Sequence, residues 1–181
     1  MKRNASVAPP AVTSRQALKF RSKGFTIIEL VVVIVILGIV SVTAASKFLN
    51  LQTDARISTL NGLKGGMEGA SAMLYGKTSA LGLDKAVSAS INVEGDDILV
   101  AYGYPAAMNQ ETWSMLIEST FLDAEWGVGN ANWYFTNSNH ADGKITYAPA
   151  SRKKEEDNCY LEYQEATETT TPVFTLTTDG C

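Results

Sequence analysis

The residues with the clearest chemical potential lie at one junction near the N-terminus, where Gly24, Phe25 and Glu29 occur close together. Gly24 and Phe25 stand where a basic segment meets a long apolar one, and Glu29 is the lone carboxylate inside the apolar segment. A carboxylate at the centre of a membrane-spanning helix costs about 2.5–3.5 kcal/mol on insertion scales, so we expect it to pair with a cation. If the chain is cut after Gly24, the new α-amino group of Phe25 is such a cation. Glu29 of one chain could then neutralise Phe25 of a neighbouring chain and fix the register between two helices, shielded from water.

The rest of the sequence offers no constellation for catalysis. It contains no Gly-x-Ser-x-Gly motif and no phosphate-binding loop, and its one histidine, His140, lies in a polar loop. The acidic runs 94–97 and 155–157 could supply oxygen ligands, but neither has the spacing of a calcium loop, and such runs usually form solvated turns. The sequence therefore predicts no enzyme activity, no cofactor and no metal.

Charge is distributed unevenly along the 181 residues, whose formal net charge is −4. All the charged residues of segment 1–24 are basic, whereas the remainder is acidic. A basic start, an apolar run and an acidic body predict a cytoplasmic N-terminus and an exported C-terminal part. The acidic body also argues against nucleic acid as a partner, because nucleic acid selects basic surfaces. The basic residues of the first segment are Lys2, Arg3, Arg15, Lys19, Arg21 and Lys23.

Two segments are predicted before the globular part. Residues 1–24 contain two prolines and three serines without an apolar period, which indicates an unstructured leader. Phe25–Ala45 is 21 residues long, close to the ~20 that a helix needs to cross a bilayer. A buried core helix is the alternative, but the basic flank and the lack of a polar face favour membrane insertion. We therefore predict a leader 1–24, a transmembrane helix 25–49 and a head 50–181.

The apolar helix is predicted to continue into the head as far as about Gly76. Apolar residues recur at steps of three and four on one face, and no proline interrupts residues 11–104. A helix over 25–76 is roughly 78 Å long, so about half of it must lie in a membrane or among neighbouring chains. A second face carries a glycine strip, which indicates either a weak helix segment or a smooth surface for close helix approach. The apolar face is Leu60, Leu63, Met67, Ala70 and Leu74, and the glycine strip is Gly62, Gly65, Gly66 and Gly69.

Short apolar runs separated by turn residues follow Gly82, and they predict an α+β head. We expect a turn at Gly95-Asp96-Asp97 and a short helix over Glu111–Phe121. The absence of a βαβ repeat predicts an antiparallel sheet packed on the long helix. The expected strands are 91–93, 98–102, 133–136, 145–148, 160–163 and 173–177.

Two cysteines, Cys159 and Cys181, lie late in the chain, beyond the membrane segment. An even count in an exported part fits one disulfide, and two free thiols are the alternative. A bridge would stabilise the head by roughly 3 kcal/mol in the chain-entropy model.

The segment Gly24–Leu30, the apolar helix after it and the late cysteine pair resemble the type IV prepilins. Residues 47–52 and the ending 178–181 are similar to the mannose-sensitive haemagglutinin pilins of Gram-negative bacteria. The prepilin motif covers about eight residues, and the closer resemblance covers the N-terminal half and the C-terminal end. For residues 85–155 the resemblance gives no match, and their assignment to the head rests on composition alone.

The resemblance implies processing and assembly. A membrane prepilin peptidase would cut between Gly24 and Phe25 and methylate the Phe25 amine. An assembly ATPase and an inner-membrane platform protein would move the subunit from the inner membrane into an extracellular pilus, where copies pack with their apolar helices inside. Glu29 would serve assembly. The resemblance also implies the pilin fold, with a C-terminal region 159–181 closed by a disulfide between Cys159 and Cys181.

The chain departs from the prepilin pattern in three places. The leader of 24 residues is long for the subclass whose mature chain begins with Phe. Either the protein truly has such a long leader, or translation starts later, at Val7 or Leu18. Ser46 occupies a position where relatives commonly have a proline, although Gly38 remains a soft point in the helix. The head departs enough that receptor contacts are not carried over.

Two other functions share part of the pattern. A conventional secreted protein would be cut after Val42-Thr43-Ala44, but this leaves Glu29 and the helix beyond it unexplained. A type II secretion pseudopilin has the same junction, and such proteins usually lack the C-terminal disulfide and often bind calcium. Within the pilin interpretation, adhesion to a host or surface glycan is a softer expectation, because Trp126, Trp133 and Tyr134 could stack on sugars or lie in the core.

Overall fold

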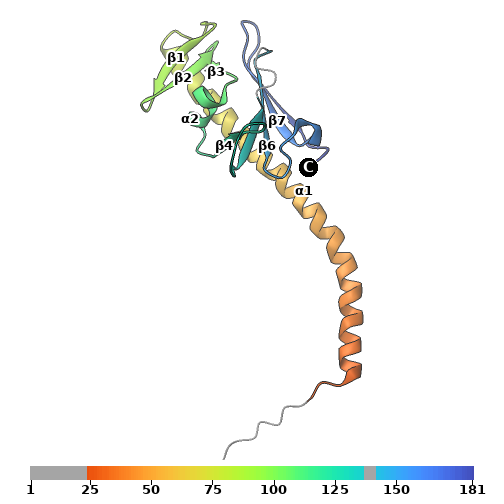
Figure 1. The fold of residues 1–181 in the computed structure, drawn as a ribbon. Coiled ribbons are helices and arrows are strands. Elements are labelled where there is room, and N and C mark those ends of the chain that lie inside the picture. The colour runs from red at the N-terminus through yellow and green to blue at the C-terminus, as the bar shows by residue number, and fades with distance from the viewer. Residues whose placement is uncertain (1–23, 137–141) are drawn as a thin grey trace, which may run out of the picture. The chain divides into compact units, whose positions relative to one another are not determined.

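The computed structural model describes residues 24–136 and 142–181. His140 and all of the expected leader except Gly24 lie outside the described residues. The chain divides into two compact units, Met1–Ala44 and Ala45–Cys181, which are considered separately below. The long helix α1 (Ile27–Ala80, 54 residues) contributes to both units (Figure 1). A continuous helix beyond the apolar segment is therefore confirmed, although it begins at Ile27 rather than Phe25 and ends at Ala80 rather than Gly76.

The end of α1 is defined by a glycine and by a buried threonine. Gly82 has a φ of 70°, a left-handed conformation that glycine adopts without strain and that commonly ends helices. The amide of Leu83 donates to the Thr78 carbonyl at 2.9 Å, which satisfies one of the last free carbonyls of the helix. The buried Thr78 hydroxyl donates to the Gly103 carbonyl at 2.8 Å and so ties the helix end to the strands that follow.

A three-stranded antiparallel sheet follows α1 in the order β1-β2-β3. It consists of β1 (Ala89–Val93), β2 (Asp96–Ala101) and β3 (Tyr104–Pro105). The β1–β2 hairpin turns at Glu94 and Gly95, which have φ values of 56° and 110°. Two successive positive φ values are typical of the tight turns that match the twist of paired strands. The expected turn at Gly95-Asp96-Asp97 is thus shifted, because both aspartates belong to β2.

The second sheet has five strands in the order β4-β5-β6-β7-β8. The strands that the sequence predicts here are confirmed as β5, β6, β7 and β8, and the pairs between them are antiparallel. The strand β4 was not predicted, and it pairs with β5 in parallel, which corrects the expectation of a wholly antiparallel sheet. The bounds are β4 (Phe121–Asp123), β5 (Trp133–Thr136), β6 (Lys144–Pro149), β7 (Tyr160–Gln164) and β8 (Val173–Thr177).

The helix expected over Glu111–Phe121 is shorter and less regular than predicted. The chain forms a π-helical turn, η1 (Asn109–Trp113), and one α-helical turn, α2 (Ser114–Leu116). Ile117 then adopts an extended conformation with φ −116° and ψ 120°, and Phe121 already belongs to β4. Trp113, Leu116, Ile117 and Phe121 have the spacing of one helical face, but they do not form one helix. They nevertheless all pack against the same core. A further 3₁₀ turn, η3 (Glu155–Asp157), precedes β7.

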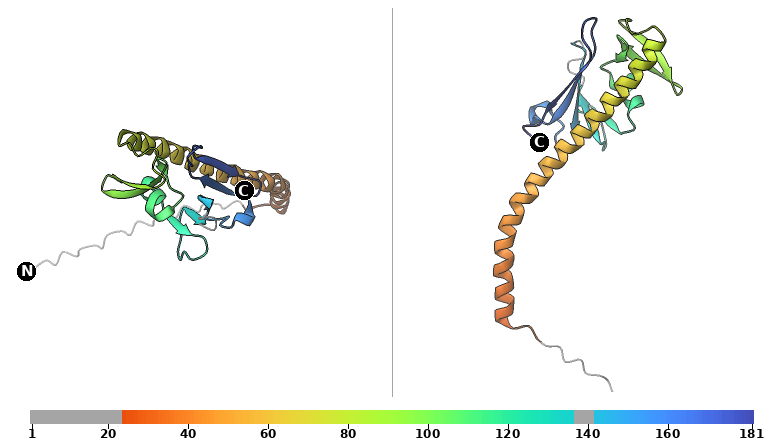
Figure 2. Two further views of the ribbon diagram at one scale, coloured as in Figure 1. Left: turned by 90° about the horizontal axis from the view of Figure 1, so that it is seen from above. Right: turned by 180° about the vertical axis from the view of Figure 1, so that it is seen from behind.

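The main core of the head lies between α1 and the five-stranded sheet (Figures 1 and 2). Leu60, Leu63 and Met67 of the predicted apolar face are buried in it, and each such side chain stabilises the fold by about 1.5–3 kcal/mol. Leu74, about two turns beyond Met67 on that face, is buried in a second cluster with residues of β1 and β2. The predicted apolar face of the helix is therefore confirmed as the side that packs on the head. The sheet residues buried in the main core are Phe135, Ile145, Tyr147, Leu161 and Tyr163, and Cys159 and Cys181 outside the strands are buried with them.

Two buried tyrosines are expected to make the head less stable at high pH. The Tyr147 hydroxyl donates to Asn109 Oδ1 at 3.2 Å and the Tyr163 hydroxyl to the Pro105 carbonyl at 2.5 Å. Burial, reinforced by nearby ionisable groups, raises the pKa of both hydroxyls well above the ordinary value of 10.0. Their stabilisation is complete below pH 10 and is lost as pH rises above it toward the folded pKa values. The free energy of unfolding between about pH 8 and about pH 11 should fall less steeply for Tyr147→Phe than for the wild type, and an equal slope would contradict this.

Candidate processing and assembly site

The Gly24–Phe25 junction precedes α1 in an irregular, exposed segment. Gly24, Phe25 and Thr26 lie outside the helix, which begins at Ile27. The Thr26 hydroxyl accepts a hydrogen bond from the Glu29 amide at 3.3 Å, and the Thr26 carbonyl accepts one from the Leu30 amide at 3.2 Å. Thr26 is therefore the N-cap of the helix. The bond between Gly24 and Phe25 lies before this cap, in exposed backbone of the kind that proteases reach.

Glu29 is exposed in the first turn of α1, three residues after its N-cap. Thr26 and Glu29 have the spacing of a capping box, and a carboxylate near a helix N-terminus is stabilised by the helix dipole. These local effects give Glu29 a structural role that does not depend on a neighbouring chain. They are worth about 1 kcal/mol, however, and do not offset the cost of a carboxylate inside a bilayer. Pairing of Glu29 with the α-amino group of another subunit stays a prediction, because the structure contains a single chain.

The helix after Glu29 exposes an unusually large apolar surface. Ile27–Ala45 is long and apolar enough to cross a membrane, with a mean hydropathy of 2.9 and none of its residues buried. Soluble monomers rarely expose contiguous apolar patches of this size. Such a surface is typical of a segment that lies in a membrane or among other apolar helices. The large apolar residues exposed on it are Ile27, Ile28, Leu30, Val31, Val32, Val33, Ile34, Val35, Ile36, Leu37, Ile39, Val40 and Val42.

The C-terminus of the head is closed by a disulfide between Cys159 and Cys181, with 4.8 Å between the two Cα atoms. Both cysteines are buried in the main core beside α1. Arg56 of α1 adds a second link, since its Nη1 donates to the Cys181 carbonyl and its Nε donates to Ser151 Oγ at 2.9 Å. The bridge ties the C-terminal residue to the start of β7, and Arg56 ties it to the long helix. The role of Arg56 was not predicted, because a single arginine outside the apolar face carries no signal of its distant partners.

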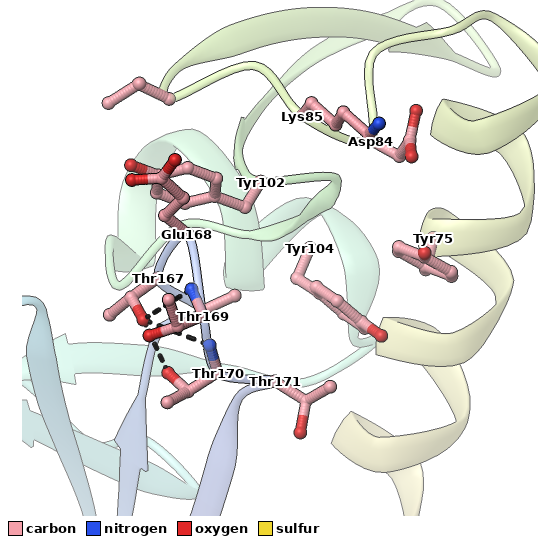
Figure 3. Close-up of a pocket in the computed structure, with 12 residues that line it drawn as sticks. Tyr75, Asp84, Lys85, Tyr102, Tyr104, Thr167, Glu168, Thr169, Thr170 and Thr171 are labelled. Atoms are coloured by element: carbon pink, nitrogen blue, oxygen red, sulfur yellow. Dashed lines mark hydrogen bonds between the residues drawn. The ribbon is translucent and has the colours of Figure 1, made fainter.

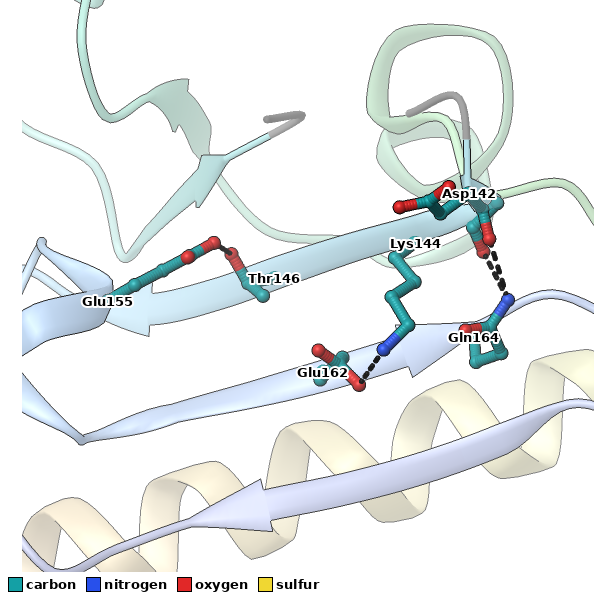
Figure 4. A network of polar contacts seen from close by, with 7 residues as sticks. Asp142, Lys144, Thr146, Glu155, Glu162 and Gln164 are labelled. Carbon is teal, nitrogen blue, oxygen red and sulfur yellow. Dashed lines mark hydrogen bonds and ion pairs between the residues drawn. The ribbon is translucent and has the colours of Figure 1, made fainter. Parts of the chain in front are cut away.

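The acidic runs serve turns and strand contacts. Asp97 accepts a hydrogen bond from the Asn92 side chain at 3.1 Å across the β1–β2 hairpin. Glu155 accepts one from the Thr146 hydroxyl at 3.0 Å, within the polar network of β6 and β7 shown in Figure 4. In the same network Lys144 pairs with Glu162 at 3.0 Å. Among the described residues, no group of three or more His, Cys, Asp or Glu side chains is placed to hold a metal ion.

The three aromatic residues considered for sugar stacking have different environments. Tyr134 is only 2% exposed and its hydroxyl donates to the Gly129 carbonyl at 3.0 Å, so its ring is a core element. Trp133 is half-buried and packs against the main core. Trp126 is 81% exposed. The core interpretation therefore holds for Trp133 and Tyr134, and Trp126 alone of the three offers its ring to solvent.

A polar pocket of about 610 Å³ lies between the end of α1, the β2–β3 turn and the threonine-rich loop 167–171 (Figure 3). Tyr75 and Tyr104 stack beside it with ring centroids 4.3 Å apart. Burial, followed by the neighbouring Tyr75 hydroxyl, raises the pKa of Tyr104. The loop is ordered by hydrogen bonds from the amides of Thr169 and Thr170 to the Thr167 hydroxyl. The lining offers aromatic rings, hydroxyls and carboxylates for binding but contains no histidine or cysteine.

Comparison with known proteins adds one finding. Residues 19–45 match the family model described as the prokaryotic N-terminal methylation motif. The matched residues include the Gly24–Phe25 junction, Glu29 and the candidate membrane span. A search of curated proteins and a search of solved structures each found no significant match.

The motif and the fold together define a class of protein. The motif supports a type IV pilin-like prepilin, that is, a pilin or pseudopilin-type substrate of prepilin peptidase. The structure agrees with the pilin fold, because an N-terminal apolar helix is followed by a β-sheet region that is mostly antiparallel. The apolar helix and the motif indicate a precursor anchored in the membrane. Members of this class act as structural subunits rather than as enzymes.

Proposed function

We propose that the protein is a structural subunit of a type IV pilus, made as an inner-membrane precursor and assembled into an extracellular fibre. The observation that carries the proposal is the fully exposed apolar segment Ile27–Ala45, which lies within the N-terminal methylation motif over residues 19–45. A membrane covers this surface before assembly, and the helices of neighbouring subunits cover it afterwards. In this proposal residues 25–49 form the core of the fibre and residues 50–181 form the head.

Assembly in this proposal begins with cleavage between Gly24 and Phe25 by prepilin peptidase, which also methylates the new Phe25 amine. The platform protein and the assembly ATPase of the inner membrane then move the subunit into the fibre. Glu29 of one subunit neutralises the Phe25 amine of its neighbour. Because this pair lies among apolar helices, removal of one charge would leave the other buried without a counter-charge. Such an unpaired buried charge is strongly destabilising.

A pilus is favoured over a pseudopilin by the way the C-terminus is closed. The disulfide joins Cys181 to Cys159, and the two hydrogen bonds of Arg56 join α1 to the Cys181 carbonyl and to Ser151. A covalent closure of this kind suits a subunit whose head lies in an oxidising compartment outside the cytoplasm, where disulfides persist. The similarity of residues 47–52 and 178–181 to the mannose-sensitive haemagglutinin pilins also supports a pilus. Adhesion to a host or surface glycan is part of the proposal, without a residue assigned to it.

Shearing of intact cells tests whether the mature subunit forms a fibre. The pilus proposal predicts that most of the mature protein is released with filaments that sediment and bind an antibody to the head. Cells that lack the assembly ATPase provide the control, because they should retain the subunit in the inner membrane. A subunit that stays in the membrane of assembly-competent cells would favour the pseudopilin alternative.

The glycine strip of α1 gives a further prediction about fibre packing. A Cβ added to Gly62 or Gly69 would meet no atom within 4 Å, whereas one added to Gly66 would lie 3.9 Å from Ile117 Cδ1. Gly62→Leu is therefore expected to keep or raise the free energy of unfolding of the head, by up to about 1 kcal/mol, because leucine favours a helix over glycine.

The same Gly62→Leu substitution should lower the fibre yield if the strip lies against a neighbouring helix. Thermal unfolding and the yield of sheared fibre are measured on the same variant, with Lys64→Leu on another side of the helix as the control. A normal fibre yield for Gly62→Leu would show that the strip is not an interface. Gly66→Leu is less suitable, because it also crowds Ile117 inside the head.

A further inference from the structure

Trp126 stands out among the tryptophans of the head. It is 81% exposed, and Val128, two residues later in the loop between β4 and β5, is 96% exposed. Trp113, by contrast, is completely buried in the main core. Exposed tryptophans with an apolar neighbour are typical of the central residues of protein interfaces. The Trp126 side chain is thus a knob that the folded head leaves uncovered.

The turn that carries Trp126 is held in one conformation. Asp123 Oδ1 accepts hydrogen bonds from the amides of Glu125 at 2.8 Å and Trp126 at 3.0 Å. The Gly127 amide donates to the Asp123 carbonyl at 3.0 Å, and a Cβ on Gly127 would lie 2.4 Å from that same carbonyl oxygen. Only glycine fits at this position without a shift of the backbone. A partner that binds Trp126 would therefore not have to order the turn, which lowers the entropic cost of binding.

A pocket of about 350 Å³ lies elsewhere on the head, between α1 and the start of β8. It adjoins the larger pocket of Figure 3 and shares with it the stacked pair Tyr75 and Tyr104. Ala72 of α1 and Pro172 before β8 add apolar surface. The pocket is within the usual range of about 300–1,000 Å³ for sites that enclose a small group. Its lining is mostly aromatic and apolar, with Glu68, Ser71 and Thr171 as its polar members, and it suits an aromatic side chain with one polar atom.

One polar atom in this pocket has an unmet hydrogen bond. Ser71 lines the pocket and is 3% exposed, and its hydroxyl has no hydrogen-bond partner among the described residues. A buried hydroxyl without a partner is destabilising, so an incoming donor would be favoured there. The indole N–H of tryptophan is a donor with no acceptor function, and a buried tryptophan usually finds a partner for it. The chemistry of the pocket therefore matches a tryptophan side chain.

We propose that Trp126 of one subunit inserts into this pocket of the next copy of the same chain, and that the Ser71 side chain, whose hydroxyl is inaccessible in the free subunit, rotates so that the hydroxyl accepts the indole N–H. The knob and the pocket are different surfaces of one molecule, so the contact is head-to-tail. Such heterologous contacts generate open-ended assemblies, whereas self-complementary ones close into dimers. The inference rests on the proposed function as a fibre subunit, and it adds a specific contact between heads to the packing of the apolar helices.

Cross-linking between two marked subunits tests this contact in the assembled fibre. Wild-type subunits are co-expressed with a Trp126→Cys variant and an Ala72→Cys variant that carry different epitope tags, and sheared fibres are oxidised. The native disulfide does not interfere, because Cys159 and Cys181 are both buried. The control pair replaces Ala72→Cys by Met73→Cys, the next residue on α1, which is exposed and does not line the pocket. The mixed dimer should form about tenfold more with Ala72→Cys than with Met73→Cys.

Equal cross-linking at positions 72 and 73, or fibres that contain both variants without a mixed dimer, would overturn the contact while leaving the pilus proposal intact. Absence of fibres from wild-type cells would overturn both. A second measurement uses Trp126→Ala in every subunit, which should weaken association between subunits about tenfold, as for a typical buried interface tryptophan. Val128→Ala is the matched control, and an equal effect of the two substitutions would also contradict the proposal.

Discussion

Glu29→Gln is expected to leave cleavage after Gly24 intact and to reduce the yield of assembled fibre at least a hundredfold. Glutamine keeps the size of the side chain and can still occupy the third helical position of a capping box, so the substitution removes the charge and little else. The methylated amine of the neighbouring Phe25 would then lie among apolar helices without a counter-charge. Breaking a buried ion pair costs about 3–5 kcal/mol, and 1.4 kcal/mol corresponds to a tenfold change in an association constant.

Thr26→Ala separates this pairing from the local role of Glu29. It removes the hydrogen bond from the Glu29 amide to the Thr26 hydroxyl and costs the helix about 1 kcal/mol, but it keeps the carboxylate. Processing is measured by the mass of the membrane-bound subunit and assembly by the amount of sheared fibre. The pairing account predicts a large loss for Glu29→Gln and a small one for Thr26→Ala. Wild-type fibre yield with Glu29→Gln, or equal losses for the two variants, would refute it.

Replacing both cysteines by serine is expected to lower the free energy of unfolding of the head by about 3 kcal/mol, within the usual range of 2–5 kcal/mol for a native disulfide. For a domain of this size the loss corresponds to a decrease in melting temperature of roughly 6–12 °C. The bridge holds the last residues to the core beside α1, so the segment after β8 should also become open to proteases.

The double variant is compared with Arg56→Ala, which removes the hydrogen bonds from α1 to the Cys181 carbonyl and to Ser151. This substitution leaves the covalent bond in place and is expected to cost about 1–2 kcal/mol. Thermal unfolding and limited proteolysis are followed for both variants and for the wild type with and without reductant. Unchanged protease resistance in the cysteine variant would show that the bridge has no structural role.

The elements with a long, regular pattern could be predicted from the sequence. The helix over Ile27–Ala80 has an apolar segment that no soluble fold needs, followed by a face on which Leu60, Leu63 and Met67 recur at helical spacing. The strands β5 to β8 are short runs of β-branched and aromatic residues bounded by turns, and these local features are enough to place them.

The elements that depend on distant contacts could not be predicted. Strand β4 has three residues, Phe121–Asp123, and it exists because it pairs with β5 across a loop that the sequence does not distinguish from other loops. The apolar spacing around Trp113 suggested a longer helix, since spacing alone does not show where the chain turns from one side of a core to another.

The same limit applies to the candidate sites. The junction at Gly24 and Phe25 is a local motif and can be read directly. The contacts of Arg56 join residues that are far apart in the chain. The exposure of Trp126 and the burial of Tyr134 both depend on the packing of the whole head.

The N-terminus of the mature protein tests the central claim most directly. The protein is recovered from the cell surface and its terminal peptide is analysed by mass spectrometry. Processing as a prepilin predicts a chain that begins with N-methylated Phe25, in agreement with the methylation motif over residues 19–45. A chain that begins near Ala45, after an ordinary signal-peptide cleavage, would contradict the account, because the mature protein would then lack Glu29 and the apolar helix on which assembly depends.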